Sequence, residues 1–350
     1  MKTFLSINFG CRVNSAETNQ LSQQLINDGF TPLLSSKEGI GVDLILVNTC
    51  AITKKGEYES ISKIKFLAKK FPQSKIIATG CANLTKIKSL KNLQIINKNN
   101  LLPSYTHQIK DKFSHTNRYL LKVQSGCTTN CSYCIVPNRR PNLWSLPIKK
   151  AIKIVNLAIA DGYQEIIITG VNLNQYQPGF SHLIEALLIQ TTIPLISFGS
   201  IPLLCIDDKF ISLVSDFRNR VSPFLHIPLQ SGSNKILKLM HRNYTKKIIL
   251  EKFKLLNAPF HQGGIKGGLN FGTDIIVGFP TETESDFQET YDLCQQIGFT
   301  KIHVFRFSPR PDTEARELFL KSTKISQKTL QFRSIRLRQL SSPALKSDNL

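Results

Sequence analysis

Strand-like apolar runs alternate with helix-like segments along most of this chain. In the first third, the apolar runs are TFLSINFG, GVDLILVNT and SKIIATG, and the segments 15–28 and 58–70 carry leucine and isoleucine at helical spacing. Strand–helix–strand repetition requires a parallel sheet with right-handed crossovers, and such sheets bind ligands at the carboxyl ends of their strands. The pattern therefore predicts an α/β protein whose functional residues gather at one edge of a parallel sheet.

A cysteine follows each of these three runs, and we call Cys11, Cys50 and Cys81 the strand-end cysteines. A parallel sheet would bring them together although they are far apart in sequence. One cysteine at a strand end is often just a small buried residue, but three at equivalent positions favour a shared metal site. Structural zinc normally takes four protein ligands, and no fourth is apparent in the sequence. We therefore interpret them as ligands of an iron–sulfur cluster with one open iron.

A second group, the cysteine triplet of Cys127, Cys131 and Cys134, follows the strand-like run 119–125. Three thiolates this close in sequence can hold one compact metal centre but cannot fill four coordination positions. In a [4Fe–4S] cluster, one iron would stay open to a chelating molecule such as S-adenosylmethionine, through its amino and carboxylate groups. Structural zinc is the alternative, but C-x2-C pairs usually come twice and this chain has one. The spacing, with Tyr133 before the last cysteine, resembles the radical S-adenosylmethionine superfamily.

Five more strand-like runs follow the triplet, at 164–170, 194–200, 224–230, 271–278 and 301–307. Together with 119–125 they make six β/α units, enough for the partial (β/α)6 barrel of that superfamily. The strand ends of a parallel barrel carry the chemistry, because loops there vary without disturbing the core. The superfamily also brings its backbone close to the adenine at the position of Gly278. The candidates for contact with the cofactor are Gly170, Ser200, Gln230, Arg242 and Gly278.

Other residues of this region have structural interpretations. Thr281 and Glu284 are predicted to form a capping box at the start of a helix. Cys205 and Cys294 lie among apolar residues and are predicted to belong to the core. His226, inside a strand-like run, is predicted to be a hydrogen-bonded core histidine rather than a ligand.

The chain is strongly basic, with 45 Lys+Arg against 24 Asp+Glu and a net charge of +21. Residues 51–122 carry 15 of the basic residues and only three acids, Glu57, Glu59 and Asp111. This excess predicts a polyanionic partner, with nucleic acid first, although lysine also accumulates without function in chains from AT-rich genomes. No run is long and apolar enough to span a membrane, and the N-terminus lacks a secretory signal. We therefore expect a soluble, cytoplasmic protein with no membrane partner.

Taken together, the motifs resemble the methylthiotransferase family within the radical superfamily. They occur in the family's order and cover nearly the whole chain. The matching motifs are FGCRVNSAET (9–18), VNTCAIT (47–53), TGCAN (79–83), SGCTTNCSYCIVPNRR (125–140), TGVNLNQY (169–176), HIPLQSGSNKILKLMHRNYT (226–245), GTDIIVGFPTET (272–283) and FRFSPRPDTEA (305–315).

The resemblance implies two [4Fe–4S] clusters and S-adenosylmethionine as cofactors. The triplet would hold the catalytic cluster that reduces S-adenosylmethionine to a radical, and the cluster on the strand-end cysteines would carry the sulfur to be transferred. A second S-adenosylmethionine would supply the methyl group. A C–H bond without acidity cannot be opened by a general base, so a radical and a water-excluding barrel suit this chemistry. An electron-donor protein is an implied partner, and we expect a monomer.

The substrate branch is indicated by the residues around Cys11. CRVN followed by Glu17 resembles the branch that acts on threonylcarbamoyl-adenosine next to the tRNA anticodon, and the basic composition agrees with a tRNA partner. The isopentenyl-adenosine branch tends to show a Gln-Met pair there, and the branch acting on a ribosomal-protein aspartate a Pro-Lys pair. Those two substrates remain alternatives. A third alternative, from another class, is a basic RNA-binding protein whose metal sites are only structural.

The expected domains are an N-terminal α/β domain (1–112), the partial barrel (113–320) and a basic C-terminal helix and tail (321–350). The polar, Lys/Asn-rich segment 95–117 indicates the first boundary. Family members usually end in a small RNA-binding β-barrel, but the residues after Arg310 lack strand alternation. We therefore expect no such barrel in this sequence, either because the barrel is lost or because the sequence is truncated. The segment 325–340 is predicted to be a basic amphipathic helix carrying Arg333, Arg336 and Arg338. The stretches 139–144 and 176–180 also depart from the family's usual pattern.

Overall fold

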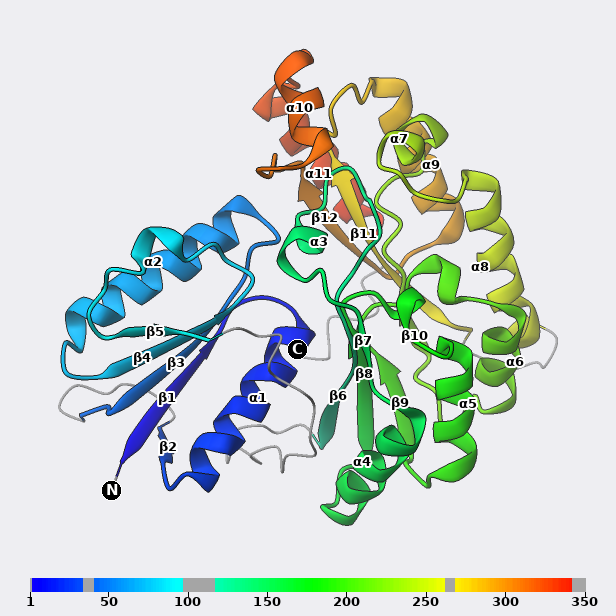
Figure 1. The fold of residues 1–350 in the computed structure, drawn as a ribbon. Coiled ribbons are helices and arrows are strands. Elements are labelled where there is room, and N and C mark those ends of the chain that lie inside the picture. Colours follow the sequence, from blue (N-terminus) through cyan, green and yellow to red (C-terminus); the bar gives the residue numbers. More distant parts are fainter. Residues whose placement is uncertain (1, 34–40, 97–116, 262–267, 342–350) are drawn as a thin grey trace. The chain divides into compact units, whose positions relative to one another are not determined.

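The computed structural model describes residues 2–33, 41–96, 117–261 and 268–341. The chain divides into two compact units that interleave in sequence. Figure 1 labels the helices and strands along the chain. Unit 1 comprises Met1–Thr128, Ile135–Val171 and Gln190–Ile193, and unit 2 comprises Thr129–Cys134, Asn172–Ile189 and Pro194–Leu350. Among the residues that the structure describes, no helix is both long and apolar enough to cross a membrane.

Unit 1 contains a five-stranded parallel sheet with the strand order β2-β1-β3-β4-β5. Its central strand is fully buried, in agreement with the continuous apolar run LILV. The parallel pairing places the carboxyl ends of all five strands along one edge. The strands are β1 (Thr3–Asn8), β2 (Thr31–Leu33), β3 (Leu44–Thr49), β4 (Lys75–Gly80) and β5 (Leu93–Ile95).

Two helices, α1 (Arg12–Asn27) and α2 (Lys54–Lys70), pack against this sheet. Leu44 and Leu46 of β3 belong to a core cluster with Leu21 of α1, whereas the alternate residues of β3 pack with α2. Because successive side chains of a strand point to opposite faces, the two helices cover opposite faces of the sheet. Both predicted helices are confirmed, and each begins three or four residues earlier than the apolar spacing suggested.

The rest of unit 1 is a smaller sheet with its own helices. The strands β6 (Arg118–Ser125) and β8 (Glu165–Gly170) pair in parallel, and the short β7 (Trp144–Ser145) pairs antiparallel with β6. Helix α3 (Val136–Arg139) lies between β6 and β7 in the chain, and α4 (Ile148–Ala160) connects β7 to β8. Tyr119 of β6 packs edge-to-face against Tyr163, which precedes β8.

Unit 2 continues the alternation of strands and helices. Its strands β10, β11 and β12 form a parallel sheet in that order, and Ile196 of β9 is bridged in parallel to Val221. The strands are β9 (Leu195–Phe198), β10 (Phe224–His226), β11 (Asn270–Val277) and β12 (Lys301–Arg306). The helices are α5 (Phe180–Gln190), α6 (Asp208–Asp216), α7 (Asn234–Leu239), α8 (Lys246–His261), α9 (Glu284–Ile297), α10 (Glu314–Lys321) and α11 (Gln327–Gln339).

The predicted order of β/α units is confirmed, with one strand much shorter than expected. Strand β10 ends at His226 rather than at residue 230, because Pro228 has no backbone N–H to donate to a ladder. After β12, the described residues form the helices α10 and α11 and no further strand. Helix α11 lies within the predicted segment 325–340.

Candidate functional site

The strand-end cysteines lie at the carboxyl edge of three neighbouring strands of unit 1. Cys11 follows β1 and is the N-cap residue of α1, while Cys50 and Cys81 come directly after β3 and β4. Asn8 pairs with Asn48 and Thr49 pairs with Gly80, so the three strands end at nearly the same level. Burial raises the pKa of the Cys50 thiol, and the charges of the neighbouring Cys81 and Cys11 raise it further. The predicted gathering of these three cysteines is therefore present.

Two glycines shape the backbone beside the strand-end cysteines. Gly10 has a φ of +109°, and a Cβ on it would lie 3.1 Å from Cys50 Sγ. Gly80 has a φ of +104°, and a Cβ there would collide with the backbone of Thr49. L-amino acids with side chains rarely adopt such φ values, so both positions require glycine. Each of these glycines directly precedes a strand-end cysteine, so the backbone turns that present Cys11 and Cys81 depend on glycine.

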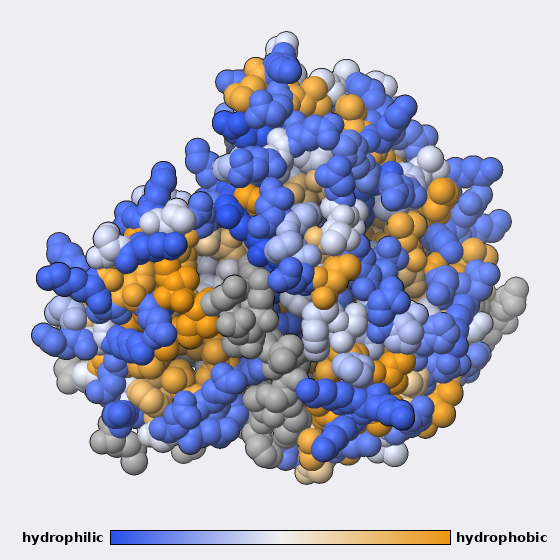
Figure 2. Space-filling view, in the orientation of Figure 1, coloured by the Kyte–Doolittle hydropathy of each residue, from blue (hydrophilic) through white to orange (hydrophobic). Residues whose placement is uncertain are grey.

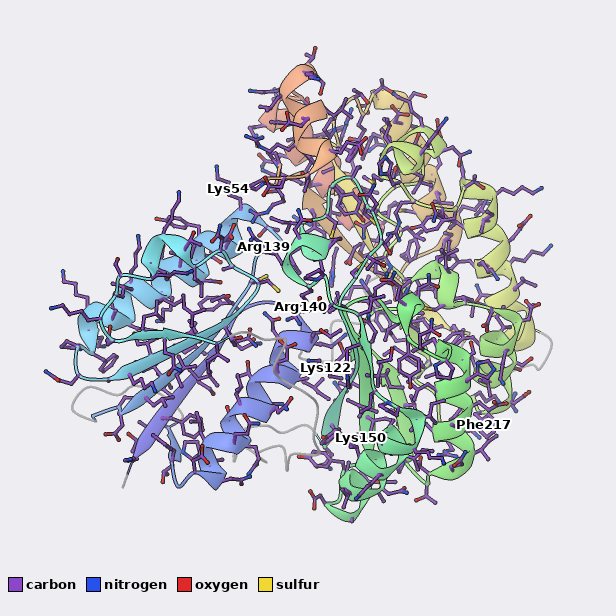
Figure 3. The ribbon with its side chains drawn as sticks, viewed as in Figure 1. Lys54, Lys122, Arg139, Arg140, Lys150 and Phe217 are labelled. Atoms are coloured by element: carbon purple, nitrogen blue, oxygen red, sulfur yellow. The ribbon has the colours of Figure 1, made fainter. Side chains whose placement is uncertain are left out.

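Three charged side chains are buried next to Cys81. Glu17 of α1 has a fully buried side chain, and the side chains of Lys122 and Arg140 are only 6% and 4% exposed. Arg140 Nη1 and Nη2 donate to the two carboxylate oxygens of Glu17 at 2.7 and 2.8 Å, and Lys122 Nζ donates to Oε1 at 2.8 Å. Arg140 Nη2 also donates to Asn14 Oδ1 at 3.0 Å. Figure 3 marks Lys122 on β6 and Arg140 just after α3.

This buried group carries one more positive than negative charge, and the excess faces sulfur. Arg140 Nε donates to Cys81 Sγ at 3.3 Å. Burial alone would raise the pKa of Glu17, but Arg140 and Lys122 lower it to about 2. Burial would likewise lower the pKa of Arg140, but Glu17 and Cys81 raise it above its ordinary value. An unbalanced buried cation is costly, so this arrangement fits a Cys81 that binds a metal as thiolate.

The loop that carries the triplet begins in unit 1. Gly126, after β6, has a φ of +84°, and a Cβ on it would collide with the backbone of Asn142. The Cys127 N–H donates to the backbone oxygen of Arg140 at 2.9 Å. Arg140 therefore contacts a cysteine of each group, Cys127 through its backbone and Cys81 through its side chain.

The other two cysteines of the triplet belong to unit 2. The Cys134 N–H donates to the Cys131 backbone oxygen at 3.0 Å, and between them Ser132 Oγ donates to the Leu239 oxygen at 2.6 Å. Tyr133 packs against a buried cluster of unit 2 that includes Phe279. These contacts fix the turn that presents the two thiols.

Arg242, a predicted cofactor contact, is half-buried and lies beside Cys131. Its Nη1 lies 3.7 Å from Cys131 Sγ, and its Nε donates to Tyr244 Oη at 2.7 Å. Its Nη2 donates to the Pro228 backbone oxygen at 3.3 Å. A fixed guanidinium at this place can complement a thiolate or a carboxylate.

The other cofactor candidates lie at strand ends as expected. Gln230 has a φ of +75° and is bridged to β11 through its backbone N–H, which donates to the Asp274 oxygen at 2.8 Å. Gly170 is the last residue of β8, and Ser200 is an exposed residue two positions after β9. Gly278 directly follows β11 with a φ of +77°.

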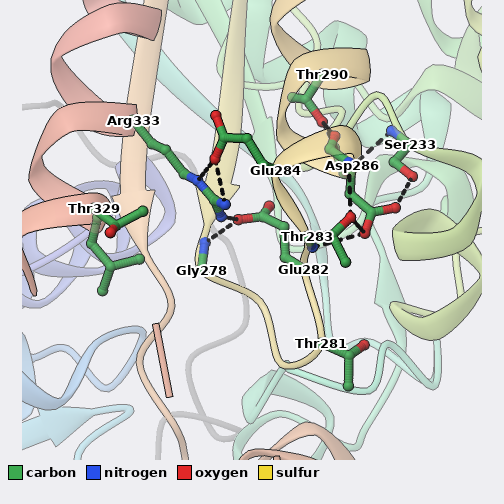
Figure 4. Close-up of polar contacts among 12 residues, drawn as sticks. Ser233, Gly278, Thr281, Glu282, Thr283, Glu284, Asp286, Thr290, Thr329 and Arg333 are labelled. Carbon is green, nitrogen blue, oxygen red and sulfur yellow. Dashed lines mark hydrogen bonds and ion pairs between the residues drawn. The ribbon is translucent and has the colours of Figure 1, made fainter. Parts of the chain in front are cut away.

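The turn at Gly278 is held by a second buried ion pair (Figure 4). Glu282 Oε2 accepts from the Gly278 N–H at 2.7 Å and from Arg333 Nη1 at 2.6 Å. Arg333 Nη2 also donates to Glu284 at 2.9 Å. Burial raises the pKa of Glu282 to about 7, although the Gly278 N–H and Arg333 lower it. Leu330 of α11 packs so closely on Gly278 that a Cβ there would overlap it.

Two predictions in this region were wrong in detail. The capping box of α9 is formed by Thr283 and Asp286, not by Thr281 and Glu284, because the helix begins at Glu284 and its N-cap is Thr283. Thr281 instead has a φ of +70° in the turn. Arg333 was expected on a basic helix face, but its side chain is buried in the pair with Glu282.

The burial predicted for the remaining residues is confirmed. Cys205 and Cys294 are buried in unit 2. His226 is buried, and its Nε2 lies 3.0 Å from Asp274 Oδ1. His303 Nδ1 lies 3.3 Å from the same oxygen, so these three residues also have donor atoms of the kind that bind a metal ion.

Sequence reasoning missed the buried charges around Glu17. Lys122 was the available signal, because it stands between Leu121 and Val123 in the middle of a strand. A lysine in that position is rarely buried without an acidic partner. The partner itself could not be named, since Glu17 and Lys122 are more than one hundred residues apart.

Comparison with known proteins adds two family models and a set of relatives. Residues 121–294 match the model described as the Radical SAM superfamily, and residues 3–99 match one described as uncharacterized protein family UPF0004. Threonylcarbamoyladenosine tRNA methylthiotransferases of Aquifex aeolicus and Chlamydia pneumoniae are 31% and 32% identical to this chain. The alignments cover 88% and 89% of this chain and 81% and 76% of theirs. A tRNA-2-methylthio-N(6)-dimethylallyladenosine synthase of Thermodesulfovibrio yellowstonii is 32% identical over 89% of this chain and 77% of its own.

Solved structures with a similar fold are radical S-adenosylmethionine enzymes. The methyltransferase TsrM of Kitasatospora setae, solved with cobalamin and a [4Fe–4S] cluster, matches with a TM-score of 0.61 and 12% identity, over 90% of this chain and 77% of its own. The cobalamin-dependent radical enzyme OxsB matches with a TM-score of 0.59 and 12% identity, over 97% of this chain and 56% of its own. At such low identity these similarities concern the fold alone.

Proposed function

The chain belongs to the methylthiotransferases of the radical S-adenosylmethionine superfamily, and we propose that it adds a methylthio group to N6-threonylcarbamoyladenosine next to the anticodon of a tRNA. The observation that supports this most is the carboxyl edge of the five-stranded sheet. There, three cysteines gather where a buried guanidinium donates to one of the sulfurs. The net charge of +21 suits a tRNA substrate.

The cofactor of the superfamily is S-adenosylmethionine with a [4Fe–4S] cluster, and we assign that cluster to the triplet. We assign a second [4Fe–4S] cluster to the strand-end cysteines. When bound, two such clusters supply reductive cleavage of S-adenosylmethionine and a site for the sulfur that is transferred. Arg140 supports both assignments, because it contacts Cys81 with its side chain and Cys127 with its backbone.

We propose that the five cofactor candidates contact S-adenosylmethionine. Arg242 offers a fixed positive charge beside Cys131 for the carboxylate of the cofactor. The backbone turns at Gln230 and Gly278 offer polar groups, and the pair of Glu282 and Arg333 keeps the second turn rigid. Gly170 and Ser200 complete the proposed set.

The remaining assignments follow from the family. We propose that an electron-donor protein reduces the enzyme and that the enzyme acts as a monomer in the cytoplasm. We also propose that its domains are residues 1–112, 113–320 and 321–350. A second candidate substrate is isopentenyl-type adenosine, because a relative named for that chemistry is as similar as those named for threonylcarbamoyladenosine.

The first test is the iron content after anaerobic reconstitution. The wild type is expected to hold about eight irons per chain, and a Cys127→Ala/Cys131→Ala/Cys134→Ala variant about four, since each cubane cluster holds four. A value of about four that falls to none would exclude the second cluster and with it the proposed reaction.

The second test identifies the product. The gene is expressed in a host that lacks its own tRNA methylthiotransferases, and the nucleosides of digested tRNA are analysed by liquid chromatography and mass spectrometry. We expect the methylthio derivative of threonylcarbamoyladenosine, and a Cys81→Ala variant as control should abolish it. The methylthio derivative of isopentenyladenosine would instead select the second candidate, and no methylthiolated nucleoside would reject both.

A further inference from the structure

The outer face of helix α2 combines aromatic and basic side chains. Tyr58 and Phe66 are 72% and 54% exposed, although large aromatic side chains are usually buried. At 100° per residue, the lysines of α2 fall on the same half of the helix as these two rings. These lysines are Lys54, Lys55, Lys63, Lys65, Lys69 and Lys70.

The acidic residues of α2 do not balance this charge. The helix has two glutamates against six lysines. Glu57 accepts a hydrogen bond from the Asn83 N–H at 2.8 Å, and Glu59 forms an exposed ion pair with Lys55 at 3.7 Å. The outer face of α2 is therefore strongly positive.

The two rings also border a hollow in the surface. It has a volume of about 500 Å³, and Phe9, Tyr58, Ser62, Lys63 and Phe66 line it together with Glu59. Lys63 Nζ lies 5.2 Å and Lys70 Nζ 6.0 Å from the centre of the Phe66 ring. The space-filling view shows hydrophobic side chains at the surface beside hydrophilic ones along this part of unit 1 (Figure 2). Single exposed hydrophobic residues are ordinary, but aromatic rings around a hollow and among lysines are not.

This face lies next to the strand-end cysteines. Phe9 is two residues before Cys11, and α2 begins four residues after Cys50. Gly56 in the first turn of α2 is close enough to Cys50 that a Cβ on it would lie 3.8 Å from Cys50 Sγ. A polymer bound along α2 would therefore reach the edge where the sulfur to be transferred is proposed to sit.

We propose that the outer face of α2, with Phe9, is a docking surface for the anticodon loop of the tRNA. Unpaired bases of the loop stack on Tyr58 and Phe66, and the lysines contact the phosphates on either side. Aromatic rings within a positive surface are the usual means of binding single-stranded RNA, because every base has a face that can stack. The naming of tRNA rests on the proposed function, whereas the prediction of a single-stranded RNA surface rests on α2 alone.

The test measures the binding of an anticodon stem–loop RNA, labelled with fluorescein, by fluorescence anisotropy. A Tyr58→Ala/Phe66→Ala variant is expected to bind about tenfold more weakly or worse, with an unchanged dependence on salt. A Lys65→Gln/Lys69→Gln/Lys70→Gln variant should also bind more weakly, and its slope of log K against log salt should fall by about 2 between 50 and 200 mM salt.

Two matched variants control for general effects. Lys149→Gln/Lys150→Gln/Lys153→Gln removes three exposed lysines from α4 of the same unit, and Phe332→Ala removes an exposed ring from α11. Both are expected to bind the RNA as the wild type does. All replaced side chains lie on helix surfaces, so the iron content of every variant is expected to match the wild type.

Three results would overturn the docking surface. The first is unchanged RNA binding by the Tyr58→Ala/Phe66→Ala variant. The second is a loss of RNA affinity in the α4 lysine variant as large as that in the α2 lysine variant. The third is full methylthiolation of tRNA by the α2 variants when tRNA is limiting. The proposed function fails separately, if the wild type holds two clusters but yields no methylthiolated nucleoside. In that case the binding data still decide whether α2 receives RNA.

Discussion

Each unit of the molecule buries an arginine–glutamate ion pair, and the two pairs differ in their surplus charge. In unit 1, Glu17 faces two cations, Lys122 and Arg140, and the surplus positive charge points to Cys81. In unit 2, Arg333 pairs with two carboxylates, those of Glu282 and Glu284. The buried one, Glu282, also accepts a hydrogen bond from the backbone N–H of Gly278. Burial is similar, since neither arginine side chain is more than 4% exposed.

The difference separates a structural pair from one that serves chemistry. The unit 2 pair satisfies its own polar groups and fixes the turn at Gly278, so it needs no further partner. The unit 1 group is left with one surplus positive charge that an anion would balance, and Arg140 donates to the sulfur of a predicted metal ligand. A buried ion pair by itself therefore says little about function, whereas its unbalanced charge indicates where an anionic ligand belongs.

The largest expected effect is the loss of Glu17. A Glu17→Gln variant leaves two buried cations without their carboxylate and is expected to lose about 3–5 kcal/mol of unfolding free energy. An Arg140→Met variant keeps the pair of Glu17 and Lys122 and should lose only about 1–2 kcal/mol, for the missing hydrogen bonds. Urea denaturation of both variants without metal measures the two losses. Equal losses would contradict the view that Glu17 balances both cations.

Second in size is the dependence of stability on pH, which should have opposite signs for the two carboxylates. The pKa of Glu17 falls from 4.5 to about 2 on folding, so its stabilisation is present above pH 4.5 and is lost as the pH falls towards 2. The pKa of Glu282 rises from 4.5 to about 7, so stability should decrease as the pH rises from 4.5 to 7. Each change amounts to about 3 kcal/mol.

Single variants assign these two slopes. The free energy of unfolding is measured by urea denaturation at intervals from pH 3 to pH 8. Glu282→Gln is expected to remove the decrease in stability between pH 4.5 and 7. Glu17→Gln is expected to remove the increase in stability as the pH rises from 3 to 4.5. A wild-type curve that is level between pH 4.5 and 7 would show that Arg333 keeps Glu282 ionised.

A smaller effect is expected on the reduction potential of the cluster assigned to the strand-end cysteines. In a background without the triplet cysteines, Arg140→Met should lower its midpoint potential, because a positive charge and a hydrogen bond at Cys81 are lost. A shift of about 60 mV corresponds to a tenfold change in the equilibrium constant of a one-electron couple. Redox titration followed by electron paramagnetic resonance measures it.

The matched control for the potential is Arg333→Met. It removes an arginine of equal burial whose partners are Glu282 and Glu284 rather than a cysteine. We expect its midpoint potential to equal that of the background. An equal shift in both variants would mean that general loosening of the protein, and not the charge at Cys81, moves the potential.

The sequence carried most of the fold and the cysteine positions, because these depend on local signals. Apolar runs and helical spacing located the strands, and parallel pairing then placed the strand-end cysteines at one edge without any contact being known. The partners of Glu17 could not be predicted from the sequence. They are more than one hundred residues away along the chain, and such a pairing depends on how the elements pack. The burial of Arg333 could not be predicted either. The sequence of its helix indicates a basic, exposed helix, but the Arg333 side chain is buried and donates to Glu282.

Strand and helix ends showed a different kind of error. Strand β10 stopped at His226, and the capping box shifted by two residues to Thr283 and Asp286. In both cases several neighbouring residues could take the same role. The choice is made by backbone geometry, such as the left-handed conformations of Gln230 and Thr281, which the pattern of residue types does not specify.

The smallest expected effect tests how firmly unit 2 holds its turn. Thr281 has a φ of +70°, which is unfavourable for a β-branched residue, so Thr281→Gly should raise the unfolding free energy by about 1 kcal/mol. Gly298, at the other end of α9, has nearly the same φ of +72° and open space around it. Gly298→Thr is therefore the matched reverse change and should lower stability by a similar amount. If Thr281→Gly lowers stability as well, the threonine side chain stabilises the turn by more than its backbone strain costs, and the turn does not rely on the pair of Glu282 and Arg333 alone.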